Sequence, residues 1–219
     1  MSKLFKSALA LLAVSTAVSA PAAYAEGEFS SNVALTTDYV WRGVSQNGEN
    51  PAVQGGFDYA NGIFYVGTWA ANADVGGANL EWDIYGGLAG ETEGGLSWDV
   101  GVIGYLYPDT DDLDFYEIYG GLGYGLTDNV EVGGYVYFDP DNESTYIEGT
   151  AGFAFTDAFG VDVSVGNYSF DGDGDYVNYS IGATLATEFV DFDLRFWGTD
   201  LDDTDIADDR IVLTVSRSM

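Results

Sequence analysis

The chain alternates apolar and polar residues with a period of two, and this alternation recurs in about twelve segments. The pattern is clearest at residues 190–198, where Val190, Phe192, Leu194 and Phe196 share one face and Arg195 shares the other with two aspartates. Successive side chains of a β-strand point to opposite faces, so this period predicts strands with one apolar and one polar side. No segment shows a helical period, and the expected fold class is therefore all-β.

Each segment is long enough for the ~9–11 residues that a tilted strand needs to cross a bilayer. Only one tight turn or one moderate loop separates neighbouring segments, which favours antiparallel hairpins. Merging two of the weaker segments would give ten strands instead of twelve. The expected strands are 29–42, 51–60, 63–71, 79–91, 95–107, 114–126, 130–138, 144–156, 159–170, 175–187, 189–199 and 210–219.

The connections between these segments alternate in length and charge. Acid-rich gaps at 108–114, 139–143, 171–175 and 200–209 alternate with tight turns such as 127–129 and 156–158. Bacterial outer-membrane barrels have short periplasmic turns and longer extracellular loops. An even strand number would place both termini on the periplasmic side. The predicted outer loops lie near residues 43–50, 72–78, 108–113, 139–143, 171–175 and 200–209.

Alternation alone does not distinguish a soluble lipocalin-like barrel from a membrane barrel, because the two differ only in which face points inward. Carboxylates on the polar face favour a wet lumen. The final segment, 210–219, resembles the closing strand of an outer-membrane protein, although Met219 stands where an aromatic residue is usual. We therefore predict an antiparallel up-and-down transmembrane β-barrel. Aromatic residues near segment ends are interpreted as membrane-interface girdles: Tyr39, Trp41, Tyr105, Tyr107, Tyr135, Tyr137, Phe138, Tyr176, Tyr179, Phe196 and Trp197.

The first 25 residues have the pattern of a cleaved secretory signal peptide. Lys3 and Lys6 precede an apolar run at 9–18, and residues 23–25 form an A-x-A cleavage site. An uncleaved anchor is the alternative, but the apolar run is short for a membrane span. We expect residues 1–25 to be removed and residues 26–219 to form the barrel domain in the outer membrane of a Gram-negative bacterium.

Composition excludes several functions. The sequence has 36 acids, no histidine and no cysteine, and only four arginines remain as cations after residue 25. Nucleic-acid binding depends on cations, and Ser-His-Asp and histidine-ligated zinc sites need histidine. We therefore predict no enzyme activity, no required cofactor and no nucleic-acid partner. The expected partners are outer-membrane lipid, the barrel-assembly and periplasmic chaperone machinery, and small solutes.

Charged residues on the polar faces are candidate pore-lining groups. Arg42 is interpreted either as a pore residue paired with Asp38 or Asp58, or as a structural ion pair that fixes strand register. Arg195 is expected to pair with Asp191 and Asp193. A lumen rich in carboxylates should favour cations. The candidates are Arg42, Asp58, Glu81, Asp83, Glu117, Glu131, Asp162, Asp191, Asp193 and Arg195.

The loop aspartates suggest weak Ca²⁺ or Mg²⁺ binding. Residues 171–175 resemble the start of an EF-hand loop, but Gly182 occupies the twelfth position, where that motif needs a glutamate. The other interpretation is a hydrated anionic surface that opposes aggregation. The candidate metal ligands are Asp171, Asp173, Asp175, Asp202, Asp203 and Asp205.

A resemblance to a known family accompanies these patterns. Residues 35–46 (LTTDYVWRGVSQ), 51–59 (PAVQGGFDY), 67–69 (GTW) and 98–105 (WDVGVIGY) are similar to the TorF-type porin family, also called the Gcw_chp family. The resemblance implies an outer-membrane porin or transporter and carries over no functional residue. The predicted function is diffusion of small solutes, with cations favoured. The alternative is a non-conducting structural or adhesive barrel whose loops bind divalent cations.

Overall fold

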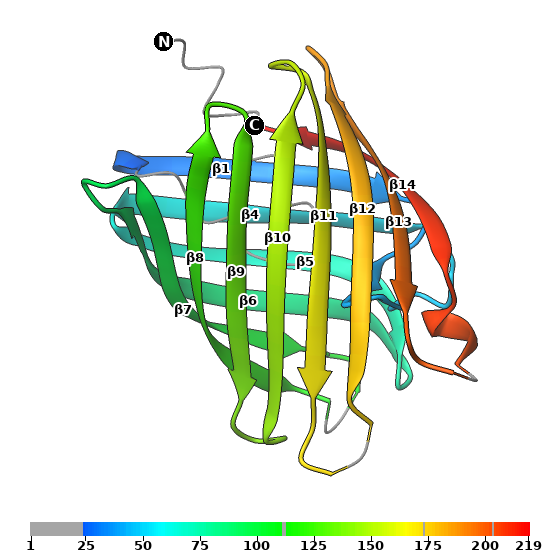
Figure 1. Cartoon of the computed structure of the whole chain (residues 1–219). Coiled ribbons are helices and arrows are strands. Elements are labelled where there is room, and N and C mark those ends of the chain that lie inside the picture. Colours follow the sequence, from blue (N-terminus) through cyan, green and yellow to red (C-terminus); the bar gives the residue numbers. More distant parts are fainter. Residues whose placement is uncertain (1–23, 111–112, 173, 203) are drawn as a thin grey trace.

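Twelve antiparallel strands form one closed barrel in which β14 pairs with β1 (Figure 1). This computed structural model describes residues 24–110, 113–172, 174–202 and 204–219. The predicted fold class and the count of twelve are confirmed. The barrel strands are β1 (Tyr24–Thr36), β4 (Ala52–Gly62), β5 (Phe64–Val75), β6 (Ala78–Glu91), β7 (Leu96–Leu106), β8 (Phe115–Thr127), β9 (Val130–Asp139), β10 (Ser144–Ala154), β11 (Phe159–Ser169), β12 (Tyr176–Ala186), β13 (Asp191–Thr199) and β14 (Arg210–Ser218).

Between β1 and β4 lies a separate small hairpin, β2 (Val40–Trp41) paired with β3 (Val44–Ser45). A single 3₁₀ turn, η2 (Asp205–Ala207), precedes β14. Within the described residues, no helix is long and apolar enough to cross a membrane.

The connections alternate between the two ends of the barrel. One end, called the long-loop end, carries the connections 37–51, 76–77, 107–114, 140–143, 170–175 and 200–209. The other, called the short-turn end, carries residue 63 and the turns 92–95, 128–129, 155–158 and 187–190. Strand β1 begins and β14 ends at the short-turn end (Figure 1). The alternation predicted from the sequence is therefore confirmed except at residues 76–77, where the connection at the long-loop end is short.

One predicted outer loop is wrong. Residues 72–78 do not form a loop, because β5 continues to Val75 and β6 begins at Ala78. Only Gly76 and Gly77 connect the strands, with φ of 57° and 94°. Two consecutive residues with positive φ make the tight hairpin turn that suits twisted strands, and glycine adopts it without steric cost.

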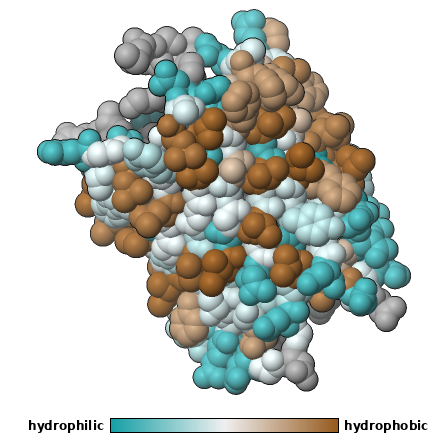
Figure 2. Space-filling view, viewed as in Figure 1, coloured by the Kyte–Doolittle hydropathy of each residue, from teal (hydrophilic) through white to brown (hydrophobic). Residues whose placement is uncertain are grey.

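The two faces of the wall have opposite polarity. Leu194 is 53% exposed on the outside, whereas its neighbours Asp193 and Arg195 are 6% and 3% exposed. Figure 2 shows apolar side chains spread over the middle of the viewed wall and hydrophilic ones gathered toward the long-loop end. A soluble barrel would have its apolar face inward. The observed arrangement, with an apolar exterior and a polar interior, is that of a membrane barrel.

The aromatic residues near strand ends mostly do not form interface girdles. Tyr105, Tyr107, Tyr137, Tyr176 and Trp197 are buried inside the barrel, and only a few, including Phe138 and Tyr179, face outward. The distance of a residue from the end of its strand determines how deep in the membrane its side chain lies. Its odd or even place along the strand determines whether the side chain points to the lumen or to the lipid. The aromatic residues were assigned to membrane-interface girdles from their closeness to strand ends alone. This assignment is wrong for the residues that point inward, which also include Tyr39, Trp41 and Tyr135.

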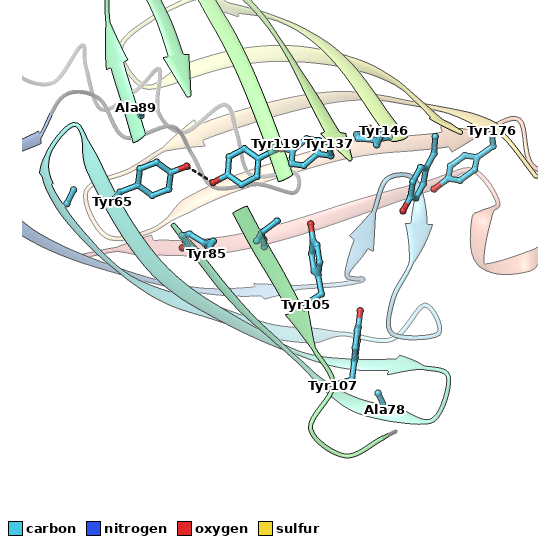
Figure 3. Close-up of a cluster of buried hydrophobic side chains, with 13 residues drawn as sticks. Tyr65, Ala78, Tyr85, Ala89, Tyr105, Tyr107, Tyr119, Tyr137, Tyr146 and Tyr176 are labelled. Carbon is cyan, nitrogen blue, oxygen red and sulfur yellow. Dashed lines mark hydrogen bonds between the residues drawn. The ribbon is translucent and has the colours of Figure 1, made fainter. Parts of the chain in front are cut away.

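Interior tyrosines lie against glycines on neighbouring strands. Tyr119 pairs across the ladder with Gly101, and Tyr135 pairs with Gly121. A Cβ added to Gly101 would lie 2.5 Å from the Tyr119 hydroxyl oxygen. The missing glycine side chains therefore let these rings lie along the wall. Figure 3 shows Tyr119 in a row of inward rings with Tyr65, Tyr137 and Tyr146.

Candidate functional site

The connection 37–51, called here the inserted loop, folds into the barrel at the long-loop end. Tyr39 and Arg42 are only 7% and 2% exposed. On one side of the lumen, Val40 packs with Trp197 and Val212. On another, the Tyr39 hydroxyl donates to Glu81 Oε1 at 2.6 Å. The loop therefore crosses the interior and contacts opposite parts of the wall.

The strand predicted over 29–42 ends early, at Thr36, and the predicted outer loop 43–50 is part of this inward fold. Arg42 and Gly43 have φ of 50° and 86°, values that a β-strand does not contain. At Gly43 an added Cβ would lie 2.5 Å from Thr199 Cγ2 and 2.9 Å from Asn178 Cβ. Only glycine fits this turn, because the loop backbone passes directly against the wall.

Arg42 anchors the inserted loop. Its guanidinium donates two hydrogen bonds to the Glu117 carboxylate, at 2.7 and 2.8 Å, and the Tyr105 hydroxyl donates a third at 3.0 Å. The guanidinium carbon also lies 4.1 Å and 4.6 Å from the ring centroids of Tyr146 and Tyr168. A bidentate arginine–carboxylate pair within aromatic faces combines charge, hydrogen bonding and cation–π attraction.

Burial disfavours the charged guanidinium of Arg42, but Glu117 and the nearby tyrosines outweigh it and raise the pKa of Arg42 above its usual value. Arg42 therefore remains a cation inside the lumen.

Both partners suggested for Arg42 by the sequence are wrong. Asp38 instead accepts hydrogen bonds from Arg210 at 2.8 Å and from Ser45 at 2.7 Å, and Asp58 accepts one from Tyr85 at 2.6 Å. The register-fixing interpretation is also wrong, because Arg42 lies in a loop and its partner Glu117 lies on β8. The ion pair fixes the position of the loop.

Arg210, at the start of β14, holds the outer part of the loop. Its guanidinium lies 2.8 Å from Asp38 Oδ2 and 3.3 Å from Glu49 Oε1. Glu49 is largely exposed, with 55% of its side chain accessible. The Arg210–Glu49 contact is therefore open to solvent, whereas the Arg210–Asp38 pair, with side chains 11% and 8% exposed, is nearly buried.

A second arginine network lies in the wall, toward the short-turn end. Arg195 donates to both oxygens of Asp162, at 2.6 and 2.8 Å, and to Asp193 at 3.2 Å. Ser180 accepts a further bond at 3.1 Å. The sequence predicted Asp193 correctly as a partner. The other expected partner, Asp191, is half-buried and makes no hydrogen bond to Arg195 in the described structure.

Several interior carboxylates have no arginine beside them in the described part of the chain. There, Glu81 accepts hydrogen bonds only from two hydroxyls, those of Tyr39 and Tyr107. Asp83 is 6% exposed, and its Oδ1 has no hydrogen-bond partner in the described structure. Asp99 accepts from Tyr65 at 2.7 Å and from Tyr135 at 3.2 Å. Glu131, another predicted lumen residue, is half-buried on β9.

The prediction of pore-lining residues missed Asp99, Glu148 and the tyrosines. Asp99 and Glu148 are 1% and 9% exposed and face the interior. Strict alternation along 95–107 and 144–156 would have assigned both to the polar face. Tyr105, Tyr107 and Tyr176 were assigned to the membrane interface instead, because residue type alone does not distinguish an interior hydroxyl from an interfacial one.

The four candidate metal ligands that the structure describes lie in the loops at the long-loop end. Asp171, Asp175, Asp202 and Asp205 are exposed, whereas residues 173 and 203 lie outside the described part of the chain. Asp175 accepts a hydrogen bond from the backbone of Phe170 at 2.9 Å. Across the described ranges, no three acidic side chains converge as a metal site. Divalent binding stays a prediction.

Comparison with known proteins agrees with the fold. A family model described as "Bacterial protein of unknown function (Gcw_chp)" matches residues 20–218. No curated protein sequence matches the chain. The structure is similar to the KdgM porin, with a TM-score of 0.63, 8% identity, and coverage of 86% of this chain and 97% of that one.

Two further solved structures have the same fold. The KdgM porin in complex with disordered oligogalacturonate gives a TM-score of 0.63 at 8% identity, covering 87% of this chain and 98% of that chain. The NanC porin gives 0.58 at 8% identity, covering 86% and 98%. At such low identity these similarities establish the barrel architecture and nothing about the solute.

Proposed function

Since the chain belongs to the Gcw_chp family, and since its barrel has the porin architecture, we propose that it is an outer-membrane channel for small solutes that favours cations. The apolar exterior supports insertion into lipid, and the polar interior supports passage of hydrated solutes. The long-loop end faces outward in this proposal, because outer-membrane barrels carry their longer loops on the extracellular side.

The proposed preference for cations is supported by the net negative charge of the side chains inside the barrel. Acidic side chains facing inward outnumber the arginines, and both buried arginines are already paired with carboxylates. Rings of acidic side chains favour cations in channels. The inward acids are Glu81, Asp83, Asp99, Glu117, Glu148, Asp162 and Asp193, against Arg42 and Arg195.

The inserted loop is the proposed constriction. It carries Arg42 into the part of the lumen where Glu81 and Glu117 also lie, and it contacts opposite parts of the wall. A solute must therefore pass between the loop and the wall, or the loop must move aside. Passage depends on the loop, whereas the barrel itself stays closed by its β1–β14 seam.

Single-channel recording of the refolded protein in planar bilayers tests the proposal. Under a potassium chloride gradient we expect a reversal potential that reports preference for K⁺ over Cl⁻. Replacing Glu148 by Gln should reduce this preference, and Asp157→Gln, on an exposed short turn, is the charge-matched control. Anion preference in the wild-type channel would contradict the assignment.

A second candidate function is a non-conducting structural or adhesive barrel. The specific observation in its favour is the inserted loop itself, since its aromatic and charged side chains fill part of the lumen. A variant in which residues 38–50 are replaced by a short glycine–serine linker separates the two candidates. If neither the wild type nor this variant conducts while both fold, the non-conducting function is correct.

Divalent binding by the acidic loops is a separate part of the proposal. Calorimetric titration with CaCl₂ and MgCl₂ should show weak binding if the loop aspartates act together. If no binding is seen at millimolar concentration, the role left for the loop aspartates is that of a hydrated anionic surface.

Export is tested by sequencing the N-terminus of the mature protein, where Glu26 is expected as the first residue. Insertion by the barrel-assembly machinery is expected to follow.

A further inference from the structure

The described arginines leave one part of the lumen without a counter-charge. Arg42 pairs with Glu117, Arg195 with Asp162 and Asp193, Arg210 with Asp38, and Arg217 donates to backbone carbonyls of the turn at 187–190. None of them forms an ion pair with Glu81 or Asp83 within the described residues.

Glu81 and Asp83 lie two positions apart on β6 and therefore share the interior face. They are 2% and 6% exposed. The oxygens of Glu81 accept hydrogen bonds from neutral hydroxyls, and Asp83 Oδ1 accepts none from the residues that the structure describes. Buried carboxylates are normally paired with a cation or fully hydrogen-bonded, because leaving water removes their solvation. Glu81 and Asp83 therefore offer acceptor oxygens to a positively charged group, and no such group of the described chain pairs with them.

Aromatic rings surround the same place. Asp83 pairs across the ladder with Trp69 on β5 and with Tyr105 on β7. From the inserted loop, Tyr39 packs edge-on against Trp69 at 5.3 Å, and Trp41 packs against Tyr105 at 5.9 Å. Carboxylate acceptors beside tryptophan and tyrosine rings bind ammonium groups through charge-assisted hydrogen bonds and cation–π attraction.

We propose that Asp83 and Glu81, walled by Trp69, Tyr105 and the loop aromatics, form a binding subsite for the ammonium group of a small organic cation. The ammonium nitrogen donates to Asp83 Oδ1 and supplies the missing counter-charge. This inference deepens the proposed channel function by naming the chemical class of a solute. The site lies beside the inserted loop, so binding and passage are coupled to the position of that loop.

Isothermal titration calorimetry on the refolded full barrel in detergent tests the site, with n-propylammonium chloride as the probe at constant ionic strength. We expect saturable binding to the wild type. Asp83→Asn should weaken it about tenfold or more, because it removes a charge-assisted hydrogen bond. Asp157→Asn, on the exposed turn at 155–158, is the matched control and should bind as the wild type does.

A second measurement uses only the wild type and does not depend on how the variant folds. 1-Propanol has nearly the same shape as the probe but no charge, and it should not bind. Equal binding of both compounds, unchanged binding by Asp83→Asn, or no binding to the wild type would each overturn the proposal. Stronger binding of Na⁺ or Ca²⁺ than of the probe would also overturn it, in favour of an inorganic ion site.

Recording conductance on the same preparation separates this inference from the channel proposal. A barrel that conducts K⁺ but does not bind propylammonium contradicts the subsite alone. A barrel that binds propylammonium but does not conduct contradicts the channel function alone and leaves the subsite in place.

Discussion

The two buried arginines differ in what holds them. Arg195 lies on β13, and its partners Asp193, Ser180 and Asp162 lie on β13, β12 and β11, three consecutive strands of one wall. Arg42 lies on a loop, and its partner Glu117 is 75 residues away on β8. The first network is part of the hydrogen-bonded barrel. The second joins a separate segment to that barrel.

This difference separates the stability of the barrel wall from the stability of the loop inside the lumen. Breaking the Arg195 network leaves two carboxylates uncompensated within a wall that cannot open without losing strand pairs. Breaking the Arg42 network leaves one carboxylate that water can reach once the loop moves. The wall network should therefore determine whether the barrel folds, and the loop network should determine whether its lumen is obstructed. Four variants test this division, in order of expected effect.

Replacing Arg195 by Met should have the largest effect. It leaves Asp162 and Asp193 as buried unpaired charges, and the free energy of unfolding should fall by about 3–5 kcal/mol. Denaturant unfolding of the barrel in lipid vesicles measures this change. Arg217→Met, at an exposed position near the end of β14, is the control and should cost much less. Similar losses in both variants would remove the special role of the wall network.

Replacing Arg42 by Met should free the inserted loop and leave the barrel folded. Loss of the Glu117 pair should shift the equilibrium of the loop by about 3 kcal/mol, or roughly 100-fold. Limited proteolysis within residues 44–50 and single-channel conductance should both increase. If this variant instead unfolds as readily as the Arg195 variant, the two networks are not distinct.

Replacing Gly43 by Ala should loosen the loop without touching any charge. The added methyl would collide with Thr199 and Asn178, a cost of about 1–3 kcal/mol in well-packed surroundings. Gly77→Ala is the matched control, because Gly77 also has positive φ but has no atom within 4 Å of an added Cβ. Faster loop proteolysis in the first variant alone is the expected result, and equal rates in the two variants would show that the close contacts of Gly43 do not hold the loop.

Replacing Glu49 by Gln should have the smallest effect. Its pair with Arg210 leaves 55% of the Glu49 side chain open to solvent, where such contacts contribute about 0.2–1 kcal/mol. Loop proteolysis should rise slightly at low salt, and the difference from wild type should shrink at 1 M salt because exposed charges are screened. A large, salt-independent effect would mean that the Arg210–Glu49 pair anchors the loop as the buried Arg42 pair does.

The barrel wall was predictable from the sequence because one local rule determines it. Parity along a strand assigns each residue to a face, so the inward positions of Asp162, Asp193 and Arg195 followed from the pattern at 159–165 and 190–198. The same rule applies to every strand and needs no knowledge of distant residues. It also gave the correct strand number.

The inserted loop was not predictable in this way. Residues 37–42 continue an apolar and aromatic pattern that resembles a strand, and nothing local indicates that Arg42 will meet Glu117 across the lumen. The sign that was available is Gly43 directly after Arg42, a residue suited to a left-handed turn. The hairpin at 76–77 was missed for a related reason, since its two glycines were read as part of a longer loop.

The pairing of interior tyrosines with glycines on the next strand has a consequence for how such a barrel can evolve. At Gly121 the three atoms nearest to an added Cβ all belong to the ring of Tyr135, which pairs with it across the ladder. Gly121 should therefore be intolerant of change while Tyr135 is present and more permissive once that tyrosine is replaced by a small residue, whereas Gly101 stays restricted by the Gly86 carbonyl oxygen, 2.8 Å from an added Cβ. Gly121 and Tyr135 should be inherited together, so that pore width changes there in steps of one pair rather than one residue at a time.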